Sequence, residues 1–141
     1  MTDGRTLLFR VGPTIYGCDI QAVREIVPNR RATRLPGAPS YVQGLINVRG
    51  TIVTVLDVGV RLDPDGSGAR APASEGSIIM VEHGSRTVGL VVQEVLDVRR
   101  LTLGDEEVVD AAGVVRGVGR VDEAVVVALD VHTLIKQVLL T

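Results

Sequence analysis

Short runs of apolar residues alternate along the chain with turn-forming residues, and this pattern predicts a mainly β protein. The runs are rich in Val and Ile and are bounded by Gly, Pro, Asn or Asp, as is typical of strands. No run approaches the ~20 apolar residues that a membrane-spanning helix needs. The predicted strands cover residues 7–11, 15–20, 42–46, 51–58, 78–81, 87–92, 114–121 and 124–129.

Two stretches have a helical spacing instead. Apolar residues at Ile20, Val23 and Val27 predict one or two helical turns over this segment. A C-terminal helix is predicted from Asp130, whose carboxylate can cap the first turn.

The remaining segments are predicted to be connections. Residues 93–99 are interpreted as a short connector. The polar segment 63–76 is rich in Gly, Pro, Ala and Ser, and it lacks the apolar residues needed to order itself. It is therefore predicted to be a mobile loop.

The second half of the chain repeats the first. Gly17 and Gly89 lie 72 residues apart (89 − 17), and an offset of 73 relates Gly44 to Gly117. Glycine matches at a nearly constant offset are harder to obtain by chance than valine matches in a Val-rich chain. Further matches pair Gln21 with Gln93, Val23 with Val95, and the Leu-Asp-Val triplet at 56–58 with that at 129–131.

This repeat predicts the domain organisation. Each copy supplies about five short strands, which suits a small β-barrel. The prediction is a single domain over 1–141 made of two barrel units, approximately 7–62 and 77–137, with a groove between them that a partner can occupy.

Composition and charge narrow the classes of function. The chain carries a net charge of −2 with a pI near 5.6, which argues against general nucleic-acid binding. The basic run at Arg30, Arg31 and Arg34 is interpreted as a solvated loop. A single cysteine, Cys18, excludes an intramolecular disulfide and is expected to be a small buried apolar residue. The start of the chain resembles no signal peptide, so a cytoplasmic protein without membrane insertion is expected.

No catalytic constellation is evident in the sequence. The two histidines, His83 and His132, lie in a predicted turn and at a helix start, with no nucleophile placed beside either. The nearest approach to paired carboxylates is Asp57 with Asp130, which hold equivalent repeat positions and suit capping roles. No cofactor and no metal site are predicted.

One extended pattern is specific enough to identify a family resemblance. The segment Leu35-Pro-x-Ala-Pro-x-Tyr-Val-x-Gly-Leu-Ile-Asn-Val-Arg-Gly-Thr-Ile-Val53 resembles the core of the CheW-like family, and the likeness extends from Leu7 to Ile135. It implies two SH3-like five-stranded barrels that share a core, with short helices including a C-terminal one.

The same resemblance implies a function. Family members are non-enzymatic adaptors that bridge the cytoplasmic tip of chemoreceptors and the regulatory domain of a CheA-type histidine kinase. The chain is then expected to be cytoplasmic and recruited to membrane-associated receptor arrays.

The expected partner-binding residues centre on the Asn-x-Arg-Gly turn. The repeat offset places Asp122 opposite Arg49, so the duplicated fold does not itself require an arginine there. Arg49 is interpreted either as a solvated or ion-paired residue held by Glu25, or as a contact with the receptor at the mouth of the groove. The predicted site comprises Arg49, Glu25, Asn47, Gly50, Val23 and Gly44.

Two alternatives stay open at this stage. The first is an adaptor of a non-flagellar chemosensory pathway. In a different class of function, the groove serves a small-molecule-binding or enzymatic barrel, for which the sequence offers few convergent polar groups.

Overall fold

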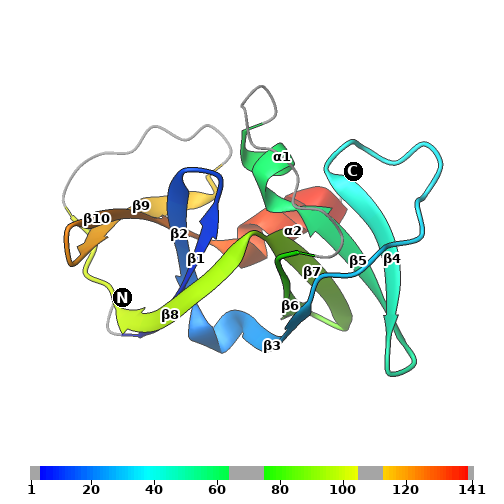
Figure 1. The fold of residues 1–141 in the computed structure, drawn as a ribbon, viewed down its shortest axis with the longest axis horizontal. Coiled ribbons are helices and arrows are strands. Elements are labelled where there is room, and N and C mark those ends of the chain that lie inside the picture. Colours follow the sequence, from blue (N-terminus) through cyan, green and yellow to red (C-terminus); the bar gives the residue numbers. More distant parts are fainter. Residues whose placement is uncertain (1–3, 64–74, 105–112, 140–141) are drawn as a thin grey trace. The chain divides into compact units, whose positions relative to one another are not determined.

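The computed structural model describes residues 4–63, 75–104 and 113–139. The chain divides into two compact units. Unit 1 contains Met1–Ala22 and Val95–Thr141, and unit 2 contains Val23–Glu94. Each unit is built on a five-stranded sheet (Figure 1).

The sheet of unit 1 combines strands from both ends of the chain. Its order is β8 (Glu94–Arg100), β1 (Arg5–Val11), β2 (Thr14–Asp19), β10 (Ala124–Leu129) and β9 (Val115–Val121). The β1–β2 and β9–β10 pairs are antiparallel, whereas β10 runs parallel to β2. A buried cluster of Leu8, Leu101, Val121, Val126 and Ala128 fills this unit. It also holds the 3-10 turn η1 (Ile20–Ala22) and the C-terminal helix α2 (Val131–Leu139).

Unit 2 has the same strand arrangement. Its order is β3 (Val23–Pro28), β6 (Ser77–His83), β7 (Arg86–Val92), β5 (Thr51–Asp57) and β4 (Val42–Val48). The core contains Val27, Ile46, Val48, Val53, Val55, Ile78, Met80 and Val91. The short helix α1 (Val58–Leu62) follows β5, and Asp57 caps it by accepting a hydrogen bond from the Val60 N–H at 3.0 Å.

The two units and the two sequence repeats have different boundaries. The β1–β2 hairpin of the first repeat pairs in the sheet that contains β8, β9 and β10 of the second repeat. The β6–β7 hairpin of the second repeat likewise pairs in the sheet of β3, β4 and β5. In this exchange the chain leaves unit 1 after Ala22, forms unit 2, and returns to unit 1 at Val95.

The registers of the parallel strand pairs agree with the repeat. Gly17 lies opposite Ala128 in unit 1, and Gly89 lies opposite Val55 in unit 2. Both glycines make room for close side chains. A Cβ on Gly17 would lie 2.5 Å from Thr6 Cγ2, and one on Gly89 would lie 2.6 Å from Ile78 Cγ2. The matched glycines therefore mark equivalent close approaches in the two sheets.

The fold class predicted from the sequence, mainly β with two five-stranded sheets and a C-terminal helix, is confirmed. Two local predictions are wrong. Helical turns were expected over 20–27, but only Ile20–Ala22 is helical and Val23–Pro28 forms β3, whose backbone pairs with β6. The expected connector over 93–99 is the edge strand β8.

The loop predicted over 63–76 lies for the most part, at 64–74, outside the described residues. Within the part of the chain that the structure describes, neither helix is long and apolar enough to cross a membrane.

Candidate partner-binding site

The predicted site is built on the tight turn between β4 and β5. Val48 pairs with Thr51, so Arg49 and Gly50 are the two turn residues, with φ of 50° and 86°. Positive φ at both central positions is typical of the hairpin turn that matches strand twist. The Asn47 side chain stabilises the turn, because its Oδ1 accepts a hydrogen bond from the Gly50 N–H at 2.8 Å. Three of the predicted residues therefore form one local structure.

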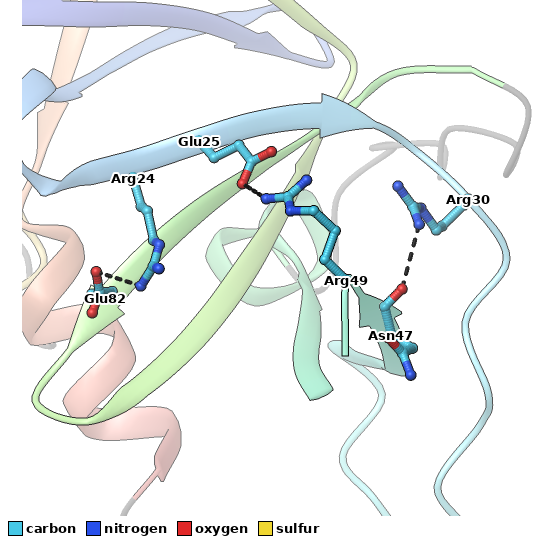
Figure 2. A network of polar contacts seen from close by, with 6 residues as sticks. All are labelled: Arg24, Glu25, Arg30, Asn47, Arg49 and Glu82. Carbon is cyan, nitrogen blue, oxygen red and sulfur yellow. Dashed lines mark hydrogen bonds and ion pairs between the residues drawn. The ribbon is translucent and has the colours of Figure 1, made fainter. Parts of the chain in front are cut away.

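Arg49 forms an ion pair with Glu25, as Figure 2 shows. Glu25 lies on β3, which is one edge of the unit 2 sheet, and Arg49 follows β4, which is the other edge. The pair thus joins the two edges of a five-stranded sheet. The Arg49 side chain stays 70% exposed and the Glu25 side chain 29% exposed, so guanidinium donors remain available to a partner.

Each residue of the Arg49–Glu25 pair stabilises the charged form of the other. The hydrogen bond from Arg49 lowers the pKa of Glu25 and is the largest effect. Burial opposes it, and the charges of Arg49 and Arg24 add smaller contributions that lower the pKa. The hydrogen bond with Glu25 in turn raises the pKa of Arg49. Because the folded pKa of Glu25 is depressed, the pair is fully formed above the ordinary pKa of a glutamate. It weakens as the pH falls through the lowered value.

Two neighbouring contacts were not foreseen from the sequence. Arg24 forms an ion pair with Glu82 at 2.7 Å, and Arg30 donates from Nη1 to the backbone oxygen of Asn47 at 3.5 Å (Figure 2). The sequence shows the adjacent charges of Arg24 and Glu25, but the segment was predicted to be helical, not a strand. The partner Glu82 requires the register of β3 against β6, which a single sequence does not reveal.

Val23 and Gly44 have a different relation to this turn. Val23 is half-buried and pairs with Val81 at the start of β3. Gly44 is buried in β4 with φ of 142°, and a Cβ there would lie 2.1 Å from the Thr33 carbonyl oxygen. Close backbone packing therefore accounts for a glycine at this position.

Unit 1 also contains an ion pair between the turn after one edge strand and the other edge strand, but with reversed polarity. Asp122 follows the edge strand β9 and lies 3.5 Å from Arg99 on the other edge strand, β8. Arg99 also approaches Asp97 at 3.8 Å. In unit 2 the turn supplies the cation, whereas in unit 1 it supplies the anion.

The side chains at the Asn47–Gly50 turn are suited to binding a partner and not to catalysis. An exposed guanidinium held by one carboxylate can grip a carboxylate or carbonyl of a partner with its remaining donors. Among the described residues no group of three or more His, Cys, Asp or Glu side chains is placed to hold a metal ion.

Comparison with known proteins gives a consistent result. The CheW-like domain family matches residues 5–139. Chemotaxis protein CheW of Rhizobium meliloti is 42% identical over 106 residues, which cover 74% of this chain and 65%, slightly under two thirds, of that protein. Chemotaxis protein CheW of Klebsiella aerogenes is 31% identical over 136 residues, covering 92% of this chain and 80% of that protein.

A solved structure agrees with the sequence matches. The crystal structure of scaffolding protein TtCheW from Thermoanaerobacter tengcongensis superposes with a TM-score of 0.78 at 28% identity. The superposition covers 95% of this chain and 88% of that one. The likeness therefore includes both five-stranded sheets.

Proposed function

The chain belongs to the CheW-like family, a family of non-enzymatic scaffold proteins, and on that premise we propose that it couples chemoreceptors to a CheA-type histidine kinase. The observation that carries the proposal is the match over residues 5–139, which leaves no part of either sheet unaccounted for. Such an adaptor works in the cytoplasm and is recruited to membrane-associated receptor arrays.

The kinase contact is proposed to lie at an apolar sheet edge. β8 is an edge strand, and its Leu96 and Val98 are 40% and 37% exposed. Residues two apart on a strand point to the same face, so these side chains form a small apolar surface beside an unpaired backbone edge. An edge of this kind suits pairing with a β domain of the kinase.

The receptor contact is proposed to lie at the Asn47–Gly50 turn. Arg49 is exposed and held in place, so a receptor carboxylate or carbonyl can bind it with little loss of side-chain freedom. Glu25 positions the guanidinium, while Asn47 and Gly50 set the turn that presents it.

A pull-down followed by titration tests the proposal directly. The purified protein should bind the regulatory domain of its cognate kinase, and the complex should be only weakly sensitive to salt because the contact is apolar. Replacing Leu96 and Val98 together by Asp should abolish this binding. The matched control is Ile52→Asp, since Ile52 is 59% exposed on β5, which is not an edge strand. Absence of kinase binding at about 100 µM protein would contradict the adaptor function.

A further inference from the structure

A hollow in unit 2 is lined by arginines and by no acidic residue. It has a volume of about 290 Å³ and lies on the segment between β3 and β4. Arg30, Arg31 and Arg34 contribute three positive charges to a chain whose net charge is −2. Among the residues that the structure describes, none of these three arginines forms an ion pair, whereas Arg24, Arg49 and Arg99 each have a carboxylate partner.

The fold does not require arginines at this place, as the repeat shows. Thr33 N–H donates to Leu45 O at 2.8 Å, and Gly104 N–H donates to the equivalent Val118 O at 2.8 Å. Thr33 and Gly104 are thus equivalent, which makes Arg30 the counterpart of Leu101.

The two units fill the same core position differently. In unit 1 Leu101 is buried and packs over Gly119, where a Cβ would lie 2.5 Å from Leu101 Cδ1. In unit 2 the counterpart of Gly119 is Ile46, which is itself buried and fills the core directly. Residue 30 is therefore not needed to fill the core of unit 2. The fold alone does not explain why an exposed arginine stands there.

The backbone that carries the arginines is anchored. The Arg30 N–H donates to Asn29 Oδ1 at 2.9 Å, and Asn29 Nδ2 donates to the Glu75 carbonyl at 2.9 Å. Thr33 and Leu45 exchange two backbone hydrogen bonds of 2.8 Å. A fixed backbone keeps the three guanidinium groups near one another despite their repulsion. The loss of backbone conformational entropy on binding is therefore smaller.

The lining of the hollow favours a peptide over an enclosed small molecule. None of its ten lining residues is buried, whereas small-molecule sites enclose most of their ligand. Leu35, which is 41% exposed, and Pro39 also line the hollow and add apolar contacts to the charges. Gln43 and Ser40 add polar groups to the lining. We propose that this basic hollow binds an acidic segment of a protein partner that carries at least one large apolar side chain.

The proposal does not depend on the proposed contacts of Arg49 and β8, although Arg30 also donates to the Asn47 backbone of the Arg49 turn. Its test needs neither the receptor nor the kinase. The probe is a fluorescein-labelled peptide, Glu-Glu-Leu-Glu-Glu-Leu, titrated with the full chain and followed by fluorescence anisotropy. The expected Kd is on the order of 100 µM at low salt, and it should rise steeply with salt concentration. The peptide with Gln in place of every Glu should not bind.

Matched variants separate the hollow from overall charge. The triple variant Arg30→Gln, Arg31→Gln, Arg34→Gln should bind roughly tenfold more weakly or worse. A control triple, Arg86→Gln, Arg100→Gln, Arg120→Gln, changes the net charge equally at exposed positions elsewhere and should bind as the unaltered chain does. Leu35→Ser should weaken binding of this peptide but not of one with Gly in place of Leu. If the first triple does not fold, as judged by circular dichroism, Arg34→Gln alone serves and should weaken binding a few-fold.

Three results would overturn the proposal. One is no binding at about 1 mM peptide. Another is an equal loss in the two triple variants, which would show attraction to net charge alone. The third is displacement of the peptide by ATP or inorganic phosphate at equal or lower concentration, which would make the hollow a site for small anions.

Discussion

Arg49 and Asp122 occupy the same position in the two repeats and carry opposite charges. Both have the left-handed backbone of a two-residue turn, with φ of 50° and 54°. Each pairs with a side chain on the opposite edge strand of its own sheet, Arg49 with Glu25 and Asp122 with Arg99. The shared feature is an ion pair across the sheet edges, so fold stability accounts for a pair in each unit but not for which residue carries the positive charge.

Arg49→Glu tests whether that positive charge is needed for receptor coupling. The variant should fold, because the Arg49 side chain is 70% exposed and glutamate, like arginine, has a Cβ at the positive φ of this position. Receptor-dependent activation of the kinase should fall by about tenfold or more, while binding of the kinase regulatory domain stays unchanged. The measurement is kinase autophosphorylation in reconstituted receptor membranes, beside a pull-down with the kinase domain.

The charge-swapped double variant, Arg49→Glu with Glu25→Arg, separates the two roles of this pair. It restores an ion pair across the sheet edges and should regain any stability lost in the single variant. It should not regain coupling if Arg49 contacts the receptor. Normal coupling by the single variant would show that Arg49 is not part of the receptor site. Arg86→Glu, at the start of β7, is the matched control, because it makes the same change of charge at another position.

Gly44→Ala tests the packing role of the one buried glycine in the predicted site. A Cβ at this position would collide with the Thr33 carbonyl, which accepts a hydrogen bond from the Leu45 N–H, while the Thr33 N–H donates to the Leu45 carbonyl. We expect the free energy of unfolding to fall by at least roughly 2 kcal/mol, measured by urea denaturation. Gly37→Ala is the control, because Gly37 also has positive φ, 79°, but no atom lies within 4 Å of its Cβ position. That variant should cost only about 1 kcal/mol, and equal losses would mean that backbone conformation, not the collision, decides.

The sequence predicted the central strands and the edge strands β4 and β9, but it missed the edge strands β3 and β8. The strand β5 is a nearly unbroken apolar run rich in β-branched residues, because consecutive residues in its second half are buried on both faces. The strand β8 is almost wholly exposed and carries charges such as Asp97 and Arg99, so its few apolar residues do not form the buried run by which the other strands were recognised. β3 was mistaken for helix because a few apolar residues fit either spacing.

The sequence repeat could not predict that the hairpins are exchanged between the two sheets. An offset of 72 or 73 residues shows which strands are equivalent, but the same equivalence holds whichever hairpin pairs with which sheet. At the candidate site, the link between Arg49 and Glu25 was one of two sequence interpretations, and the ion pair is present. The packing of Gly44 against Thr33 needs the path of the segment before β4, which no local pattern specifies.

Cys18 should be unreactive in the folded protein. Its side chain is 1% exposed, and burial together with the nearby charge of Asp19 raises the pKa of the thiol to about 12. Since the thiolate is the reactive form, the folded chain should not react with Ellman's reagent at about pH 8. One equivalent of thiol should appear when guanidinium chloride unfolds the chain. Rapid reaction without denaturant would show that the β2 region opens readily.

Asp130 should make stability depend on pH through its cap of α2. Its Oδ1 accepts the Thr133 N–H at 3.1 Å and its Oδ2 accepts the Thr133 hydroxyl at 2.8 Å. Burial by itself raises the pKa of Asp130, but the hydrogen bonds from Thr133 and the charges of Arg116 and His132 outweigh it and lower the pKa overall. Because the folded value lies below the unfolded one, the stabilisation is fully present above the unfolded pKa near 3.8 and is lost as the pH falls through the folded pKa.

Asp130→Ala should therefore lower the free energy of unfolding by roughly 1 kcal/mol at about pH 7, and by less at about pH 3. Asp130→Asn is the matched control, since an amide oxygen can still cap the helix but cannot titrate. It should retain most of the stability near neutral pH and remove this residue's share of the acid sensitivity. The measurement is a set of urea titrations between about pH 3 and pH 7. If the loss in Asp130→Ala were the same at every pH, the carboxylate would not be the charged cap that the geometry indicates.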